Sequence, residues 1–562
     1  MHTKWKNSSV GKLFLALGIN FVILALTQIF ATSYFALYDD VVMNDIAAGY
    51  YGEDFSQYLV FPNIIYGFIL KFLYSLSHAV NFYGIIQFVL AFFCFWMVSY
   101  VFLERYSYVM GTVLSALNGV LFSYFAFISL QFTQLAAICC ATGGIVFFYG
   151  LKARKTYLQL AGIFQIMAGY WIRDDVFWST LPFLLILLLR YCLEEGFFKK
   201  EHWYKRQRRL FLSSFTLIFC LLLSHFIDYK VYEAKDWKEY TEYNVCRASI
   251  LDYELPEYKE NEEFYKSIGF SENDVKMLAN WNYADNDKYT IENLKKISRY
   301  NDSKRKLHLD LKIIQEIGAK IVESGDGFFC VYFAMALSVI ALIGLKGYRK
   351  WYVVLMWGAV VAEYWYLLCN GRIPQRTYFA IWFMSTIMLL TLLLDNMLTG
   401  KKSALIWGSG FLLAATICCF VQYPVINKQQ TATNYLEEQE RCERLLNDIA
   451  KASDNLYLID CRSIDLPREV FYVLKGSASN YVPLGGWICP TPMYQQILYN
   501  YDVENPVRAL AKSRENLYYV TQHGNGTVEI LTKYLQENYR KKIKAKLVDT
   551  CYNYEVYCFT VK

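Results

Sequence analysis

Residues 13–40, with the sequence LFLALGINFVILALTQIFATSYFALYDD, decide the fold class of this chain. The apolar run from residue 13 to residue 35 is long enough for a membrane-spanning helix, which needs about 20 apolar residues. Three lysines precede the run, and positively charged flanks remain in the cytoplasm. We therefore expect Asp39 and Asp40, which follow the run, to emerge on the outer side of the membrane.

The composition is that of a chain that crosses a membrane many times. Hydrophobic residues make up 55% of the sequence and charged residues 19%, and the apolar residues are gathered in long runs. The net charge of +6 does not indicate a nucleic-acid partner, because much of the Lys and Arg excess lies in short loops. The first run is longer than the apolar part of a cleavable signal peptide, so we expect it to be retained as an anchor.

The basic loops determine the number of spans. Twelve runs are apolar, but if all twelve crossed, four basic clusters would lie outside: Lys152–Lys155, Lys199–Arg209, Lys346–Lys350 and Lys401–Lys402. Leaving residues 59–77 out of the membrane places all four clusters in the cytoplasm, as the positive-inside rule requires. The sequence therefore predicts a polytopic α-helical membrane protein with eleven transmembrane helices, at residues 13–35, 83–103, 109–128, 131–151, 156–172, 176–193, 210–227, 328–345, 352–369, 376–395 and 403–422.

The run at residues 59–77 has the features of a helix in the membrane interface. Pro62, Asn63, Gly67 and Lys71 interrupt its apolar character, and aromatic residues are frequent along it. We expect it to lie along the outer interface and to help form a cavity. The alternative is that it is an ordinary second span and that another helix has been miscounted.

Three longer segments are expected outside the membrane. The first is the acidic loop at residues 36–82, and the second is a charge-rich, soluble and helical loop at residues 228–327. The third is the tail at residues 423–562, in which helical periodicity gives way to strand-like stretches. We therefore divide the chain into a transmembrane domain, residues 1–422, and an extracytoplasmic α/β domain, residues 423–562.

Two local features of the second loop allow specific expectations. Ser271 followed by Asp274 is typical of a helix N-cap with an acidic third residue. Arg247 and Asp252 could reach a site, but a structural ion pair is the preferred interpretation.

Several classes of chemistry lack their motifs. The six histidines are scattered, and neither an H-E-x-x-H pattern nor a Walker motif occurs, which disfavours zinc hydrolysis and ATP-driven transport. No C-x-x-C pattern is present, so a thiol redox site or a zinc ribbon has no support.

Acidic and arginine residues on the outer side are the strongest chemical signal. Transfer of a sugar from a lipid phosphate to a hydroxyl needs a carboxylate to accept a proton and cations to hold the departing phosphate. Asp39 or Asp40 can serve as the base, and of the two we expect Asp40, with Asp39 beside it. Arg173, Arg372 and Arg376 can hold the phosphate, because a guanidinium group binds phosphate oxygens in a bidentate manner.

Asp174, in the same turn as Arg173, completes the predicted substrate-binding set. A plainer interpretation stands beside the functional one: carboxylates that follow a span can be solvated interface residues, and arginines at helix ends commonly extend to lipid headgroups. Arginine is disfavoured in short outer loops, however, so we expect a functional reason for these three.

The order of these features resembles that of the GT-C superfamily of membrane glycosyltransferases. One helix is followed by an outer acidic loop that opens with Asp39-Asp40, by the stretch Phe61-Pro-Asn-Ile-Ile-Tyr66, by many spans and by an outer soluble tail. The resemblance covers the architecture of residues 1–422. The loop at residues 228–327 departs from the family pattern.

The resemblance implies a bacterial hexosyl- or pentosyltransferase that uses a polyprenyl- or dolichyl-phosphate sugar. Asp40 or Asp39 would be the base, and Arg372 or Arg376 would lie near the lipid phosphate. The acceptor would be a cell-envelope glycan, lipid or protein, and the active site would face the outside of the cytoplasmic membrane. The role of metal stays open: Mg²⁺ or Mn²⁺ could bridge the acidic loop and an anionic donor, or the arginines could neutralise the phosphate without an obligatory metal.

Two other functions remain open. A polysaccharide polymerase or lipid-linked glycan flippase would need charged residues along several spans, and only Glu363 and Asp395 are notable there. A non-enzymatic membrane receptor or scaffold would use the C-terminal domain for binding, but it leaves the Asp39-Asp40 loop unexplained.

Overall fold

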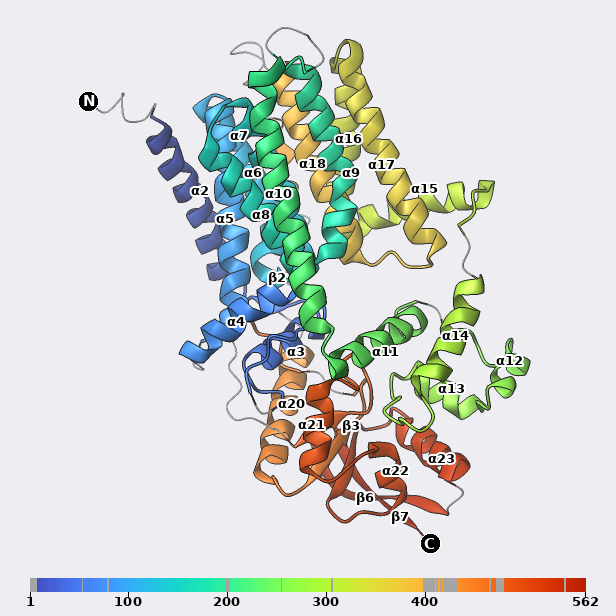
Figure 1. Cartoon of the computed structure of the whole chain (residues 1–562). Helices are drawn as coiled ribbons and strands as arrows, with labels where there is room; N and C mark the ends of the chain where they lie inside the picture. The colour runs from blue at the N-terminus through green and yellow to red at the C-terminus, as the bar shows by residue number, and fades with distance from the viewer. Residues whose placement is uncertain are drawn as a thin grey trace.

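The chain forms an upright bundle of helices that stands on a layer of shorter helices and a small sheet (Figure 1). The computed structural model describes residues 8–52, 54–77, 80–197, 203–253, 255–304, 307–397, 410, 413–414, 417, 433–463, 466–471, 480–539 and 542–561.

Eight helices of the described residues are long and apolar enough to cross a membrane. The outward faces of the first and sixth of these keep large apolar side chains exposed, such as Phe21 and Phe215, as a lipid-facing surface would. The prediction of a polytopic helical fold is therefore confirmed. The eight helices are α2 (Ser9–Phe30), α5 (Phe82–Arg105), α6 (Tyr108–Ser123, continued to Ile128), α7 (Phe132–Lys152), α9 (Asp174–Glu194), α10 (Trp203–Tyr232), α17 (Lys350–Cys369) and α18 (Gln375–Met397).

Two further predicted spans are shorter helices. α8 (Thr156–Ile172) packs against α7, and α16 (Cys330–Gly344) meets α15 (Leu311–Gly327) at a bend of 117°. With this bent pair counted as one, the described residues hold up to nine spans by length and composition. Most of the last predicted run, 403–422, lies outside the described residues. The count of eleven therefore stays a prediction.

The run at residues 59–77 forms α4 (Ile64–Leu76), which has 13 residues. At 1.5 Å per residue this helix is about 20 Å long, which is too short to cross the hydrocarbon core. Asn63 begins it by accepting a hydrogen bond from the backbone N–H of Ile65 at 3.1 Å. Figure 1 shows α4 inclined across the lower end of the bundle. Its predicted place in the membrane interface stays a prediction.

The polar loops gather at two opposite ends of the bundle. Because successive helices run in alternate directions, Lys152–Lys155 and Lys346–Lys350 lie at one end, at the top of Figure 1. The end of α2, the turn at Arg173 and the turn between α17 and α18 lie at the other end, next to the soluble layer. Lys401–Lys402 and part of Lys199–Arg209 lie outside the described residues. Which end faces the cytoplasm stays a prediction.

The soluble layer contains the predicted helical loop and the predicted α/β tail. Most of the loop folds into α11 (Lys235–Leu251), α12 (Glu262–Ser267), α13 (Glu272–Ala279) and α14 (Ile291–Lys304). Its last part forms α15, which packs against α16 and α17 of the bundle instead. The capping box of Ser271 and Asp274 is confirmed at the start of α13.

The tail is built around a five-stranded sheet with the strand order β4-β3-β5-β7-β6. β3 pairs in parallel with β4 and β5, whereas β7 pairs antiparallel with β5 and β6. The strands are β3 (Leu456–Ile459), β4 (Tyr481–Pro483), β5 (Leu517–Gln522), β6 (Ile543–Cys551) and β7 (Tyr554–Val561). The helices of the tail are α20 (Thr433–Lys451), α21 (Pro492–Asn500), α22 (Pro506–Ala511) and α23 (Thr527–Tyr539).

The loop and the tail, far apart in sequence, pack into one unit. Asn282 donates a 2.7 Å hydrogen bond to the buried carboxylate of Asp460, and Tyr534 donates one of the same length to Asp285. Gly485 lies so close to the loop that a Cβ on it would be 1.9 Å from the carbonyl oxygen of Trp281. The soluble layer is therefore a joint structure, and residues of either segment can reach the end of the bundle.

Candidate active site

Both predicted acids lie in the first turn of α3 (Tyr38–Ala47), where carboxylates stabilise the positive end of the helix dipole. Adjacent residues on a helix point about 100° apart. Asp39 and Asp40 therefore meet different surroundings, and the structure separates two residues that the sequence treats as a pair.

Asp40 is fully buried within the protein. Its Oδ1 atom accepts hydrogen bonds from the hydroxyl of Tyr83 at 2.9 Å, from the Nε2 of Gln87 at 3.0 Å and from the backbone N–H of Phe132 at 3.1 Å. Burial raises the pKa of Asp40 to about 7 in spite of these donors. Asp40 thus joins α3 to the spans α5 and α7, and its side chain is enclosed by the protein.

Asp39 is half-buried, and the charges of Arg376 and Arg173 act on it. Its Oδ1 atom accepts a 3.0 Å hydrogen bond from the indole N–H of Trp487. Burial raises the pKa of Asp39 above its ordinary value and Asp252 adds to this effect, whereas Arg376, the Trp487 N–H and Arg173 oppose it. Of the two predicted acids, Asp39 is the one placed beside cations.

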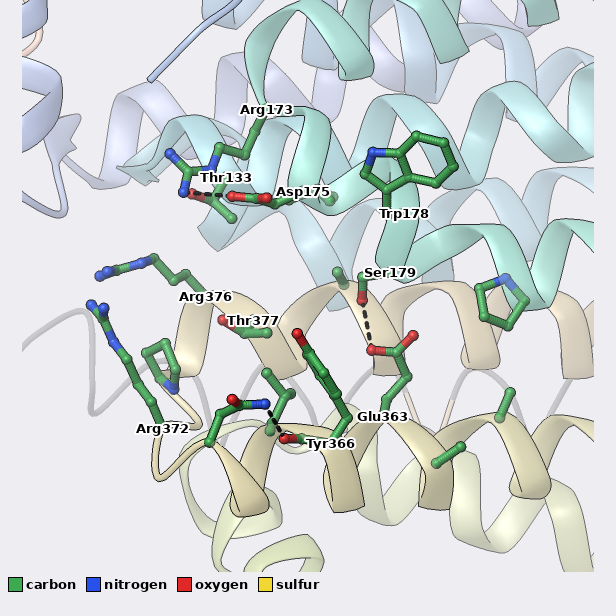
Figure 2. A pocket seen from close by; sticks show the side chains of 18 of the residues that line it. Thr133, Arg173, Asp175, Trp178, Ser179, Glu363, Tyr366, Arg372, Arg376 and Thr377 are labelled. Atoms are coloured by element: carbon green, nitrogen blue, oxygen red, sulfur yellow. Dashed lines mark hydrogen bonds and ion pairs between the residues drawn. The ribbon is translucent and has the colours of Figure 1, made fainter. Parts of the chain in front are cut away.

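A pocket of about 610 Å³ opens between α9, α17 and α18 (Figure 2). All three predicted arginines line it at one end, although they come from two separate turns of the chain. Its remaining lining comes mainly from the facing sides of the three helices, and it includes Thr133, Asp175, Trp178, Ser179, Pro182, Ala359, Ala362, Glu363 and Tyr366.

The turn between α17 and α18 determines where two of the arginines point. Gly371 adopts a positive φ of 77°, which favours glycine, and the N–H of Arg372 donates to the carbonyl of Leu367 at 3.1 Å. This Schellman-type ending turns the chain sharply, and Pro374 then leads into α18. Figure 2 shows the guanidinium groups of Arg372 and Arg376 extending in the same direction.

The arginines differ in their partners. Arg372 lies 3.6 Å from Asp252, and Asp252 also forms a 2.9 Å ion pair with Arg247. The expected ion pair of Arg247 and Asp252 is therefore confirmed, and it extends to the pocket. Arg376 forms no ion pair with any residue of the described part of the chain, although it is half-buried.

Arg173 is held by aromatic rings and by one carboxylate. Its guanidinium group lies over the rings of Phe61 and Phe132, at 5.2 and 5.7 Å from their centroids, and its Nη2 lies 2.7 Å from Asp175. Asp174, the predicted partner in this turn, is exposed and does not line the pocket. Its Oδ1 atom instead accepts a hydrogen bond from the backbone N–H of Asp175 at 2.9 Å.

Two further residues, Glu363 and Trp487, lie at the site although the sequence does not assign them to it. Glu363, which the sequence places as an acid inside a span, lines the pocket and accepts a 3.3 Å hydrogen bond from Ser179. An acid within a span is a signal of function that could have placed it there. Trp487 carried no such signal, because only the fold brings it to Asp39.

Metal ligands were left open by the sequence. In the portion of the chain that the structure describes, no group of three or more His, Cys, Asp or Glu side chains is arranged to hold a metal ion. The three guanidinium groups are the cations that this pocket itself supplies. A role for Mg²⁺ or Mn²⁺ stays a prediction.

Comparison of the chain with protein-family models, with curated proteins and with solved structures gave no match.

Proposed function

We propose that this protein transfers a sugar from a polyprenyl-phosphate donor to an acceptor hydroxyl, as a GT-C-like glycosyltransferase at the outer face of the cytoplasmic membrane. One observation carries the proposal: three arginines converge at one end of a pocket whose other walls are membrane-spanning helices, and the charges of two of them, Arg376 and Arg173, act on Asp39, which lies outside the pocket lining. In this proposal the chain has eleven spans, and both soluble segments lie outside the cell.

The pocket suits an amphiphilic anion. Arg173, Arg372 and Arg376 repel one another at close range, and an anion between them relieves this repulsion. Guanidinium groups match phosphate oxygens geometrically, and Arg376 lies in the first turn of α18, where the helix dipole also favours an anion.

The apolar walls suit a lipid chain. Trp178, Pro182, Ala359 and Ala362 line the pocket along the spans, and the small alanine side chains leave a groove on α17. Pro182 also lacks the backbone N–H of an ordinary helical residue, so α9 lacks one backbone hydrogen bond at this point. Trp178 is 58% exposed, so the groove opens sideways towards lipid. A polyprenyl chain can therefore enter from the bilayer while its phosphate binds the arginines.

Asp39 supplies the base of the proposed reaction. Its carboxylate accepts the proton of the acceptor hydroxyl, and the oxygen forms a bond to the anomeric carbon of the donor sugar. The bond from that carbon to the phosphate oxygen breaks, and polyprenyl phosphate leaves with the electron pair. The arginines stabilise the charge that develops on the phosphate. Asp40 is excluded from this role in our proposal because its carboxylate is enclosed.

The alternatives account for fewer observations. A flippase needs a polar path through the bundle, but Asp395 is paired with Arg105 and Arg190, so of the two acids noted within spans Glu363 is the one that lines the pocket. A receptor or scaffold needs neither the grouped arginines nor the carboxylate beside them.

The proposal can be tested with purified protein in liposomes and a panel of radiolabelled polyprenyl-phosphate hexoses and pentoses, with cell-envelope extract as acceptor. We expect release of polyprenyl phosphate with at least one donor. Arg376→Gln should reduce donor use by roughly tenfold or more, the effect of a lost hydrogen bond to a charged group. Arg444→Gln, which removes an exposed arginine of the C-terminal domain, is the matched control. Absence of release with every donor would overturn the proposal.

A further inference from the structure

The indole of Trp487 reaches the candidate site from the C-terminal domain. It belongs to the segment Gly485-Gly486-Trp487, which follows β4, and its N–H donates to Asp39 at 3.0 Å. Only 9% of its surface is exposed, so this hydrogen bond is shielded from water. A shielded hydrogen bond to a carboxylate is stronger than one in solvent.

Contacts from the long soluble loop and from the segment before α4 hold Trp487 in place. The hydroxyl of Tyr240 donates to the carbonyl oxygen of Trp487 at 2.6 Å, and Tyr283 donates to the carbonyl oxygen of Gly486 at the same distance. The ring of Phe61 meets the indole edge-on at 4.9 Å between centroids. Phe61 in turn lies under the guanidinium group of Arg173. The hydrogen-bond donor is therefore fixed before any substrate binds.

We propose that Trp487 is a positioning residue for Asp39, through which the C-terminal domain orients the base of the transfer reaction. This inference rests on the proposed function. It assigns the C-terminal α/β domain a part in catalysis, although that domain lies outside the membrane and contributes no residue to the lining of the arginine pocket.

The geometry explains why one donor matters at this position. Charged groups of three other segments act on Asp39: Arg376 of α18, Arg173 between α8 and α9, and Asp252 after α11. The neighbouring Asp40 of α3 adds a fourth charge. The two arginines favour the ionised form of Asp39, and the two carboxylates oppose it. The Trp487 N–H, in contrast, donates a hydrogen bond directly to Asp39. Loss of this hydrogen bond lets the carboxylate rotate and raises the pKa of Asp39.

The test replaces Trp487 without changing the packing more than necessary. Trp487→Phe keeps the aromatic contact with Phe61 but removes the N–H. Replacement of Trp487 by benzothienylalanine, which has the shape of tryptophan and lacks the N–H, serves if the Phe variant does not fold. Trp365→Phe is the matched control, because the Trp365 indole also donates a hydrogen bond, to the carbonyl of His308, away from Asp39.

The first readout is the pH profile of polyprenyl phosphate release. Asp39 must be ionised to act, so the rate falls as the pH drops through its pKa. We expect both Trp487 variants to lower the maximal rate by about tenfold or more and to move the acidic limb to higher pH. In an Asp39→Asn background, Trp487→Phe should have little further effect. A uniform loss of rate with an unmoved acidic limb would contradict the inference.

The second readout needs no substrate. A water-soluble carbodiimide modifies protonated carboxyl groups, and fragmentation of the peptide in the mass spectrometer gives the extent of modification of Asp39, separately from Asp40, at each pH. We expect the midpoint of this curve to move to higher pH in both Trp487 variants and to stay unchanged in Trp365→Phe. An unmoved midpoint overturns the inference about Trp487, even if the protein transfers sugars. A moved midpoint without any transfer activity supports the coupling and contradicts the proposed function instead.

Discussion

Asp252 lies between two arginines: its Oδ2 atom is 3.6 Å from Arg372 in the pocket, and its Oδ1 atom accepts a 2.9 Å hydrogen bond from Arg247 in the long soluble loop. The long soluble loop therefore reaches the candidate site through one carboxylate. Asp252 both steadies Arg372 and adds negative charge near Asp39.

Asp252→Asn should move the acidic limb of the activity profile to lower pH. Burial is the main reason that the pKa of Asp39 is raised, but Asp252 adds to it, so its neutralisation lowers the pKa of Asp39. The rate then persists to lower pH, a shift opposite to that expected for the Trp487 variants. Asp287→Asn removes a carboxylate that pairs with Arg508 in the soluble layer, and it should leave the profile unchanged. A shift of the limb to higher pH in Asp252→Asn would contradict this electrostatic account.

Asp40→Asn should fold and should be more stable than the natural protein at pH 8. The pKa of Asp40 is raised from 3.8 to about 7 in the folded state, so the folded protein holds its proton more tightly than the unfolded chain does. This contribution to stability is present below about pH 4 and is lost as the pH rises through 7. Asparagine keeps the acceptor oxygen and removes the charge.

Thermal unfolding in detergent at pH 4.5 and pH 8 measures this effect. We expect the two proteins to unfold at similar temperatures at the lower pH. At the higher pH the unfolding temperature of Asp40→Asn should be a few degrees above that of the natural protein, the shift that a gain of roughly 1–3 kcal/mol in the free energy of unfolding would give. If Asp40→Asn loses stability mainly at pH 8, the ionised carboxylate stabilises the fold and the account of Asp40 is wrong.

Ala359→Trp should block the groove for the lipid chain. Ala359 lines the pocket on α17, and a large side chain there competes with the polyprenyl chain for space. We expect the KM for the donor to rise by roughly tenfold, since forced overpacking typically costs 1–3 kcal/mol, while kcat at saturation changes less. Val361→Trp, on the same helix but 42% exposed and outside the pocket lining, is the control. Equal effects of both substitutions would show that the lipid does not lie in this groove.

The sequence predicts those parts of the molecule that depend on length and periodicity. Apolar runs of about 20 residues correspond to α5, α7 and α18, and the grouping of Arg173 with Arg372 and Arg376 follows from the alternating direction of the helices. α8 and α16 are apolar enough to be predicted as spans, but hydropathy does not show where a helix bends, as the 117° angle between α15 and α16 illustrates.

The rest of the site depends on tertiary packing. The first-turn position of Asp39 and Asp40 does not show which of them faces α5 and which faces the arginines, because that depends on how α3 is rotated against the bundle. The same holds for Asp174 and Asp175, of which only the latter lines the pocket. Trp487 reaches Asp39 across 448 residues of sequence, a separation at which local patterns carry no signal.

The central claim, that Asp39 is the base of a sugar transfer from polyprenyl phosphate, is tested most directly by comparing Asp39→Asn with Asp40→Asn. The measurement is the initial rate of polyprenyl phosphate release by each purified variant in liposomes, with folding checked by size-exclusion chromatography. We predict that Asp39→Asn loses about 10²–10⁴ in rate, as expected for removal of a general base, while Asp40→Asn keeps most of the activity. A wild-type rate in Asp39→Asn, or a loss confined to Asp40→Asn, would contradict the account.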